Sequence, residues 1–436
     1  MEIKAFRAFR FNGAVVGDSG DCIAPPYDVI DAARQQQLYE KNEYNIVRVI
    51  KGKTCDGDGE TNNQYTRAAK YLDEWTEKGV LKQDSEKSIY GYVQDFAIGT
   101  ENYQRSGFVS LGKLEDFGAG VKPHEQTMSN PKIDRLNLQK ATGAKFGLIF
   151  MLYDDEKRIA DKVIEKASRE TPLVDFVDEQ QVRHRLFGIS DQKQIEAVKA
   201  MMKDKSCTIA DGHHRYETAL ELYKQSGKAS AQYQLFAFVN TRNEGMIVLA
   251  THRLVGNVNG FEITKLLSAL KENFEVTEFK FESTEEKAAS RHEVLSQIKS
   301  QQGQGGSAFG IYGGDSAFYT AVLKNKDAMK SVCGEKSQAW QSLDVSVLHK
   351  LILENELGID EEKLFSGEYV EYVKDAAIAI DESIARVDSG EKQVAFFTNA
   401  PTIEQIEQVA AAGEKMPQKS TYFYPKVYTG LTIYKM

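Results

Sequence analysis

Cysteine is scarce in this sequence, which has four cysteines in 436 residues and no CxxC pair. Thiols so far apart exclude a disulfide framework and a zinc ribbon, and they fit a reducing cytoplasm, where we expect the protein to reside. No run approaches ~20 apolar residues without a charge, so we expect no membrane span. The N-terminal residues MEIKAFRAFRFNG lack the apolar stretch of a signal peptide.

A basic excess is also missing. The chain has 55 Lys+Arg against 64 Asp+Glu, a formal net charge of −9. Dedicated nucleic-acid-binding domains carry a basic excess that displaces counterions from phosphates, so we expect no nucleic-acid partner. The apolar share of 41% and the charged share of 27% are those of an ordinary globular protein, which excludes collagen-like and strongly disordered chains. The length suggests two or three domains.

Several signatures of common enzymes are absent. The sequence contains no GxGxxG, no GxxxxGK[ST] and no GxSxG. Their absence argues against a Rossmann dinucleotide site, a P-loop and an α/β-hydrolase. His124-Glu125 is not followed by a histidine at position 128, so the HExxH pattern of a zinc protease is missing as well.

Strand pairs outnumber strand–helix–strand units along the chain. Three pairs of strand-like runs flank turn-rich loops, at 88–96 with 104–114, 232–240 with 245–254, and 308–312 with 317–323. Helical patterns precede them at 31–41 and 64–78, and others lie between them at 155–170, 191–203, 213–226, 262–273 and 284–300. We therefore predict an α+β fold with mixed, largely antiparallel sheets and interleaved helices. The expected regions are an N-terminal α+β part (1–115), a core (116–330) and a helical C-terminal part with an extended tail (331–436).

The most informative motif is a strand–turn–helix unit. A short apolar run stops at Asp211-Gly212, and a helix begins at His213. Glycine lets the backbone approach a ligand, and the first N–H groups of a helix favour an anion. Arg215 can grip phosphate oxygens with two N–H groups, and His213 and His214 add donors. The unit predicts a phosphate site; the alternative is that Asp211 only caps the helix and the histidines are surface residues.

A polar loop follows a predicted strand that ends near Lys122. The proline after Lys122 keeps that residue extended, so His124 and Glu125 should lie in a loop or at a helix start. A glutamate beside a histidine is a candidate base or metal site. Lys132 and Arg135 follow in the same stretch. The alternative is a solvated polar loop.

Two further cationic groups lie near strand ends. His252-Arg253 closes the second predicted hairpin, where it could reach a phosphate, although polar surface residues are also common there. In the tail, Lys419, Ser420 and Thr421 combine a cation with two hydroxyls. Such a group can bind phosphate, although no P-loop precedes it.

Two resemblances connect these motifs. The DGHHRY sequence at 211–216, followed by a helix, resembles the phosphate-binding box of the ParB/sulfiredoxin-like superfamily, which includes nucleotide-using ParB domains, ATP-using sulfiredoxins and free-serine kinases. Through nearly its whole length the chain also resembles the bacterial and archaeal domain of unknown function 1015 family. That resemblance rests on APPYDVI at 24–30, HEQT at 124–127, DGHHR at 211–215, THR at 251–253 and MPQKSTYFYPK at 416–426.

The family resemblance implies a ParB/sulfiredoxin-like catalytic core and a role as a nucleotide-dependent free-serine kinase. The expected reaction is phosphorylation of a small hydroxylated metabolite, with free L-serine as the leading acceptor and ATP or ADP as the donor. In phosphoryl transfer the protein contributes positioning and charge stabilisation more than covalent chemistry. In this hypothesis Glu125 is the base, and His124 or His213 orients it. Mg²⁺ would be held by Asp211 or Glu125, since it prefers oxygen ligands.

The remaining predicted site residues bind phosphate or substrate. Phosphate binding is assigned to Gly212, His214, Arg215, Lys419 and Ser420, and the substrate carboxylate to a cation chosen from Arg135, Lys132, His252 and Arg253. Two other functions stay open. A ParB-like regulator would bind nucleotide without turnover and would bind nucleic acid, and a nuclease would need a two-metal carboxylate cluster. The oligomeric state is left undetermined by the sequence.

Overall fold

Two sheets organise the chain, one in each of two units. The computed structural model describes residues 1–118, 120–125, 129–374 and 379–436. The first unit comprises Met1–Pro123, Thr127–Ile247 and Pro425–Met436, and the second comprises His124–Gln126 and Val248–Tyr424. These units differ from the three regions expected at 1–115, 116–330 and 331–436. The reason is that the sheet of the first unit takes strands from both sides of residue 115, where composition marks no change.

The sheet of the first unit is mixed and mostly antiparallel. Its strand order is β6-β11-β8-β12-β5-β4-β10-β9, with β1 paired to β5. The pairs β6–β11 and β8–β12 are parallel, and the other pairs along this path are antiparallel. The bounds are β1 Ile3–Lys4, β4 Ile89–Ile98, β5 Glu101–Lys113, β6 Val121–Lys122, β8 Ile149–Tyr153, β9 Val174–Val177, β10 Arg183–Ile189, β11 Cys207–Asp211 and β12 Tyr233–Asn240. The predicted α+β class is confirmed, as is the first hairpin, β4–β5. The ParB/sulfiredoxin-like character of the core stays a prediction.

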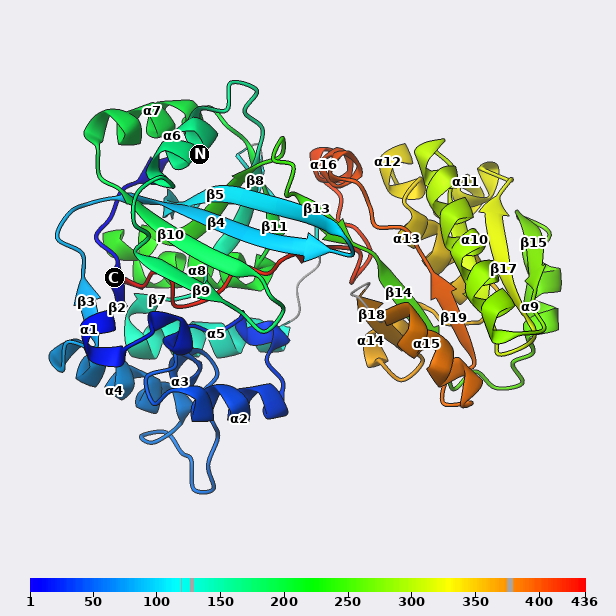
Figure 1. The fold of residues 1–436 in the computed structure, drawn as a ribbon, viewed down its shortest axis with the longest axis horizontal. Coiled ribbons are helices and arrows are strands. Elements are labelled where there is room, and N and C mark those ends of the chain that lie inside the picture. The colour runs from blue at the N-terminus through cyan, green and yellow to red at the C-terminus, as the bar shows by residue number, and fades with distance from the viewer. Residues whose placement is uncertain (119, 126–128, 375–378) are drawn as a thin grey trace. The chain divides into compact units, whose positions relative to one another are not determined.

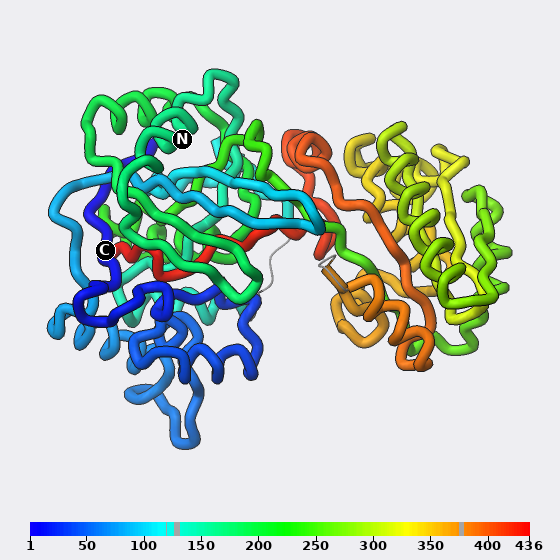
Figure 2. The backbone as a smooth tube through the Cα atoms, in the orientation of Figure 1, coloured from blue at the N-terminus to red at the C-terminus, as the bar shows by residue number. Residues whose placement is uncertain are grey.

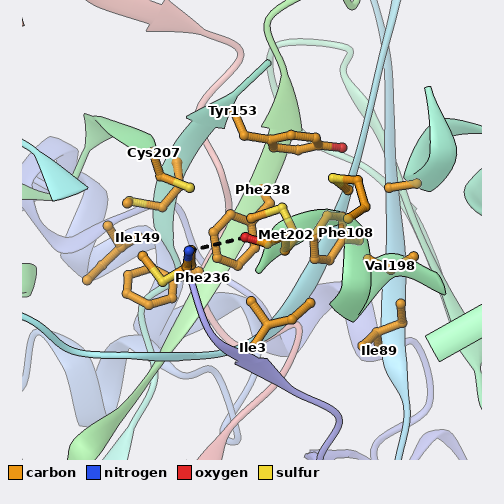
Figure 3. Close-up of a cluster of buried hydrophobic side chains, with 14 of the residues drawn as sticks. Ile3, Ile89, Phe108, Ile149, Tyr153, Val198, Met202, Cys207, Phe236 and Phe238 are labelled. Atoms are coloured by element: carbon orange, nitrogen blue, oxygen red, sulfur yellow. Dashed lines mark hydrogen bonds between the residues drawn. The ribbon is translucent and has the colours of Figure 1, made fainter. Parts of the chain in front are cut away.

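Strand β12 lies at the centre of this sheet. All its residues are buried, in keeping with its apolar sequence YQLFAFVN. Phe108 of β5 stacks on Phe238 of β12 with ring centroids 5.1 Å apart, and Figure 3 shows both rings among the side chains of the core. Val198 and Met202 of α7 pack into the same cluster. The dashed line in Figure 3 marks the bond from the Met1 ammonium to Met202 O, 3.1 Å long.

Helices cover the sheet of the first unit. In the view of Figure 1, α6 and α7 lie above its strands and α2 to α5 below them. α4, predicted as a helix at 64–78, buries Ala68, Leu72 and Trp75, and Asn63 and Thr66 form a capping box at its start. The bounds are α2 Ala32–Lys41, α3 Val47–Ile50, α4 Gln64–Glu77, α5 Ser129–Thr142, α6 Ile159–Ala167, α7 Gln192–Met202 and α8 His213–Ser226.

The last dozen residues belong to the first unit, so both chain ends lie there (Figure 2). Ala24 and Thr429 exchange two backbone hydrogen bonds, of 3.1 and 2.8 Å, and Phe9 pairs with Ile433 in the same way. Tyr434–Lys435 (β21) pairs with Ala144–Lys145 (β7). The tail therefore completes the first unit by joining segments from early in the chain.

The second unit is built on a six-stranded sheet of order β15-β17-β16-β19-β14-β18, in which all the pairs are antiparallel. Val294 and Ile298 of α10 pack on this sheet with Ile384 and Val387 of α15. The bounds are β14 Thr251–Val255, β15 Phe274–Lys280, β16 Ala308–Tyr312, β17 Ala317–Leu323, β18 Val370–Lys374, β19 Val394–Phe397, α9 Ile263–Leu270, α10 Thr284–Gly303, α11 Asp327–Cys333, α12 Gln338–Gln341, α13 Asp344–Val347, a π-helix Leu348–Glu354, α14 Glu361–Ser366, α15 Ala379–Asp388 and α16 Ile403–Ala411. The hairpin predicted at 308–323 is confirmed.

The hairpin predicted over 232–254 is wrong. β12 pairs in the first sheet, and β14 pairs in the second. A turn-rich loop between two apolar runs has the same sequence pattern whether the second strand pairs with the first or joins another sheet. The pattern therefore does not distinguish a hairpin from a crossing between sheets. Other short elements are β2 Phe9–Phe11, β3 Leu81–Gln83, β13 Ile247–Leu249, β20 Tyr422–Tyr424, α1 Gly13–Val16 and the 3-10 helices Ser19–Cys22, Tyr27–Val29 and Ala229–Gln232. Within the described ranges, no helix is both long and apolar enough to cross a bilayer.

Candidate functional site

β11 and α8 of the first unit meet at a tight turn. β11 ends at Asp211, Gly212 has a left-handed φ of 98°, and α8 begins at His213, as predicted. A Cβ atom at position 212 would lie 3.0 Å from Arg215 Cζ. Glycine therefore permits both the turn and the close approach of the Arg215 guanidinium.

Two cations hold the carboxylate of Asp211. Arg215 Nη2 donates to Oδ2 at 2.5 Å, and Lys426 Nζ donates to Oδ1 at 2.8 Å. Burial would raise the pKa of Asp211, but Lys426 and Arg215 outweigh it and keep that pKa well below its ordinary value. Asp211 is thus a carboxylate that orients two cations at the start of α8.

The backbone beside Lys426 is held by buried side chains of the first sheet. Gln94 Nε2 donates to Lys426 O at 3.0 Å, and Arg105 donates to Pro425 O. Arg105, only 1% exposed, also donates from Nε to Gln94 Oε1 at 3.0 Å. This pair of side chains on β4 and β5 fixes the backbone from which Lys426 reaches Asp211.

The loop of the APPYDVI motif lies near Arg215, because Pro26, Tyr27 and Arg215 line one pocket. Pro26 is buried, and Tyr27 begins a short 3-10 helix, Tyr27–Val29. The Arg135 guanidinium stacks over the Tyr27 ring at 4.0 Å. Burial would lower the pKa of Arg215, but Asp211, Asp28 and Tyr27 outweigh it and raise that pKa. Two motifs that are nearly 190 residues apart in the sequence therefore share one neighbourhood.

Lys132 and Arg135, predicted to bind the substrate carboxylate, both have partners within the first unit. Lys132 Nζ donates to Glu217 Oε2 at 2.9 Å. Arg135 Nη1 donates to Ile50 O at 2.7 Å, and its Nε donates to Asp134 at 2.8 Å. These contacts join α5 to α8 and to the end of α3, so both residues have an architectural role.

His124 lies against the tail segment of the second unit. Its Nε2 is 3.0 Å from Thr421 Oγ1, and Met416 N donates to His124 O at 2.8 Å. The HEQT and MPQKSTYFYPK motifs therefore pack together at this point. Glu125 follows, partly buried. Gln126 and Thr127, the rest of the HEQT motif, lie outside the described residues.

β14 places His252 and Arg253 inside the second unit, where each is 2% exposed. His252 Nδ1 accepts a hydrogen bond from Thr398 N at 3.3 Å. Arg253 donates to Thr251 O and, at 3.3 Å, to Lys419 O. Burial lowers the pKa of Arg253 to about 10. The alternative that these are polar surface residues is therefore wrong, and their contact with a phosphate or substrate stays a prediction.

The tail residues Lys419 and Ser420 form a tight turn. Lys419 has a left-handed φ of 56°, and the Ser420 hydroxyl donates to Pro417 O. The bond from Arg253 to Lys419 O joins this turn to β14. Lys419, Ser420, His252 and Arg253 thus belong to one neighbourhood in the second unit.

Asp211 does not fit the predicted role of Mg²⁺ ligand, because cations occupy both of its oxygens. Among the described residues, no group of three or more His, Cys, Asp or Glu side chains could hold a metal ion. Glu125, the other predicted ligand, belongs to the second unit. The chemistry below is therefore derived from the chain's own cations and carboxylates.

The predicted site residues thus divide between the two units. The first unit holds Lys132, Arg135, Asp211, Gly212, His213, His214 and Arg215, and the second holds His124, Glu125, His252, Arg253, Lys419 and Ser420. Lys426, Arg105 and Tyr27 were not chosen from the sequence. Lys426 and Tyr27 each lie within a motif that carried the family resemblance, which was a usable signal. Arg105 lies in a strand with no motif.

The family model for "Protein of unknown function (DUF1015)" matches residues 3–346. No curated protein matches the chain. Among solved structures, a free serine kinase in complex with AMP is 14% identical over 72% of this chain and 86% of that chain, with a TM-score of 0.35. A conserved hypothetical protein from Pyrococcus furiosus is 16% identical over 73% and 92%, with a TM-score of 0.33. SbnI with a C-terminal truncation, from Staphylococcus aureus, is 11% identical over 75% and 87%, with a TM-score of 0.33. On the extent of the family match, the chain belongs to the DUF1015 family of proteins of unknown function.

Proposed function

We propose that the chain is an ATP- or ADP-dependent kinase that phosphorylates a small hydroxylated metabolite, with free L-serine as the leading acceptor. The observation that carries this proposal is the pair of cations, Arg215 and Lys426, that Asp211 holds at the start of α8. Cations fixed in advance stabilise the charge of a transferring phosphoryl group without reorganisation. The sequence resemblance to free-serine kinases supports the choice of acceptor.

In this proposal the nucleotide phosphates lie at the N-terminus of α8. The first N–H groups of a helix have no acceptor within the helix, and the positive end of the helix dipole favours an anion. Gly212 carries no Cβ, so the Arg215 guanidinium can lie close to the backbone at this turn. Asp211 acts indirectly, as the carboxylate that aims Arg215 and Lys426.

Glu125 is proposed as the base that takes the proton of the acceptor hydroxyl. A base adds about 10²–10⁴-fold to the rate when it is well positioned. Glu125→Gln keeps the shape and removes the base, so kcat should fall by that factor while nucleotide affinity stays the same. Glu156→Gln is the matched control, because Glu156 is an exposed glutamate of the first unit.

The test is a product assay with the full chain. Purified protein is incubated with Mg²⁺ and either ATP or ADP, together with L-serine, D-serine, L-threonine, L-alanine or glycerol. We expect phosphorylated L-serine, and none with L-alanine, which lacks the hydroxyl. Absence of a phosphorylated product from every acceptor with both donors would refute the kinase. A wild-type kcat in Glu125→Gln would refute only the role of Glu125.

Binding of nucleic acid is the property that distinguishes a kinase from a ParB-like regulator. A protein that binds duplex DNA makes several Lys/Arg–phosphate contacts, and its affinity falls with salt with a slope of about −0.9 per contact. This chain has nine more acidic than basic residues, 64 against 55. We expect no shift of duplex DNA or RNA at physiological salt, with or without ATP. Salt-sensitive submicromolar binding would favour the regulator.

A further inference from the structure

Two asparagine–glycine pairs occur in the sequence, Asn12-Gly13 in the first unit and Asn259-Gly260 in the second. A glycine after an asparagine leaves the backbone nitrogen between them unhindered, because glycine has no Cβ. That nitrogen can attack the side-chain amide of the asparagine and expel ammonia. The local sequence gives both pairs the same chemistry, so a difference in their reactivity comes from how the folded chain holds each asparagine.

Asn12 is held by hydrogen bonds on both its side chain and its backbone. Its Nδ2 donates to Gly79 O at 3.1 Å, and its Oδ1 accepts from Ala14 N at 3.3 Å. Its backbone N–H donates to Val80 O at 2.8 Å, and its carbonyl accepts from Val15 N at 2.8 Å. Turning the side-chain amide carbon toward the next backbone nitrogen breaks the bonds of the amide, so Asn12 reacts only after a local opening.

Asn259 lacks these restraints. Asn259 and Gly260 are both exposed, in the turn that precedes α9 (Figure 1). Among the described residues, none forms a hydrogen bond with the Asn259 side chain or with the Gly260 N–H. A Cβ atom built on Gly260 meets no atom within 4 Å outside its chain neighbours. The Asn259 amide can therefore turn toward the Gly260 nitrogen without losing a bond.

The chain is anchored on both sides of this turn. Val258 N donates to Gln393 Oε1 at 2.8 Å, and Gln393 Nε2 donates to Val258 O at 2.9 Å. On the other side, α9 is fixed by its buried residues Leu266 and Leu270. Neither residue of the asparagine–glycine pair takes part in these anchors, so the pair can react while the second unit stays folded.

We propose that Asn259 is a site of spontaneous deamidation in the folded protein and that Asn12 is protected from the same reaction. Hydroxide removes the proton of the Gly260 N–H, and the nitrogen bonds to Asn259 Cγ. The Cγ–Nδ2 bond then breaks, and ammonia leaves after taking up a proton from water. The resulting succinimide ring adds one water: opening at Cγ gives aspartate, and opening at the backbone carbonyl carbon gives isoaspartate. The net reaction consumes one water and releases one ammonia.

A third asparagine serves as an internal control for the glycine. Asn355 is exposed, and among the described residues none forms a hydrogen bond with its side chain. It is followed by Glu356, whose Cβ hinders the approach of the backbone nitrogen. Asn259 and Asn355 thus share an unrestrained side chain in the same unit, and they differ in the residue that follows.

The experiment requires neither nucleotide nor acceptor, so its outcome is independent of the proposed kinase activity. The full chain is incubated at mildly alkaline pH in water enriched in heavy oxygen, once folded and once in urea. It is then digested at acid pH, and the peptides are analysed by mass spectrometry. Heavy oxygen in the new carboxylate marks deamidation that took place during the incubation.

In the folded protein we expect labelled aspartate and isoaspartate at position 259, with Asn12 reacting at least about tenfold more slowly because it must first open locally. In urea the two should react at similar rates, and Asn355 should be slow in both conditions. Asn259→Gln, which would need a larger ring, should abolish the reaction at this position. Protection of Asn259 in the folded chain relative to urea, or equal rates at Asn12 and Asn259 in the folded chain, would overturn the proposal.

Discussion

Lys426 Nζ lies 2.8 Å from Asp211 Oδ1, although 215 residues separate the two in the chain. The carboxylate is also bonded to Arg215, so one anion orients a cation from the middle of the chain and a cation from its last dozen residues. These two bonds fix the positively charged groups of Arg215 and Lys426 beside the turn that precedes α8. Asp211 therefore contacts two cations, and the catalytic and metal-binding roles that the motif suggested for it stay predictions.

Replacing Lys426 should weaken nucleotide binding. Lys426→Met removes one charge-assisted donor, so we expect a loss of about 1.5–3 kcal/mol in binding of ATP or ADP, measured by calorimetry. The control is Lys435→Met in the same tail. Lys435 forms a 3.6 Å ion pair with the exposed Asp73, and such surface pairs contribute little. Equal affinities for the wild type and Lys426→Met would remove Lys426 from the site.

We expect Gly212 to be needed for nucleotide binding as well as for the backbone conformation of the turn. Gly212→Ala forces a left-handed φ on a residue with a Cβ and crowds the Arg215 guanidinium, 3.0 Å away. Gly227, just after the end of α8, also has a left-handed φ, of 62°, but open space around it. Both variants should lose about 1 kcal/mol of unfolding free energy in urea. Nucleotide affinity should fall in Gly212→Ala alone, and an equal fall in both would mean that crowding of Arg215 is irrelevant.

Arg105 should contribute strongly to the stability of the first unit. Arg105→Met leaves Gln94 Oε1 and Pro425 O without their buried donor, so unfolding should become easier by about 2–4 kcal/mol. Arg183→Met on β10, a strand of the same sheet, is the control. Arg183 is half exposed in its pair with Asp175, and its loss should change stability by no more than about 0.5 kcal/mol. Similar chemical-denaturation midpoints for the two variants would contradict the role given to Arg105.

The second unit should become more stable as pH falls from about 6 to about 4. Burial raises the pKa of Asp344 to about 6, although Asn399 Nδ2 donates to Asp344 Oδ2 at 3.2 Å. The pKa of an unfolded aspartate is about 4, so between these values the folded state binds more protons than the unfolded state. The stabilisation is complete below about pH 4 and is lost as pH rises through about 6, and its size is about 1–3 kcal/mol. Urea unfolding of Asp344→Asn should show a flatter pH profile than the wild type, and parallel profiles would exclude Asp344 as the source.

The sequence predicted what local patterns determine. α8 begins and ends where the apolar stripe placed it, and the β4–β5 and β16–β17 hairpins formed around their turn residues. The loop between β12 and β13 looked like a third hairpin, but the partners of β12 are β5 and β8. Local sequence patterns do not specify which distant strand a given strand will pair with. This part of the topology could therefore not be predicted from the sequence.

In the candidate site, too, local features could be predicted from the sequence and contacts between distant segments could not. The turn at Gly212 was expected from the sequence, whereas the bond from Arg215 to Asp211, four residues earlier, was not predicted. Arg135 was expected to meet the substrate, yet it stacks on Tyr27 and bonds to Ile50 O. Those partners come from segments about a hundred residues earlier in the chain. The sequence around a charged residue does not show which distant groups will accept its hydrogen bonds in the folded chain.

The tail that completes the first unit has a consequence for biosynthesis. Pro425–Met436 pairs with β7 and with the backbone at Ala24 and Phe9, and it carries Lys426 to Asp211. A ribosome delivers these residues only after it has made Val248–Tyr424, which form nearly all of the second unit. The first unit to begin emerging is therefore the last to be finished, and β7 and the backbone at Phe9 and Ala24 lack their tail partners until the other unit has been made. Nascent chains arrested before residue 425 should show a protease-resistant second unit attached to a first unit that is still cleavable.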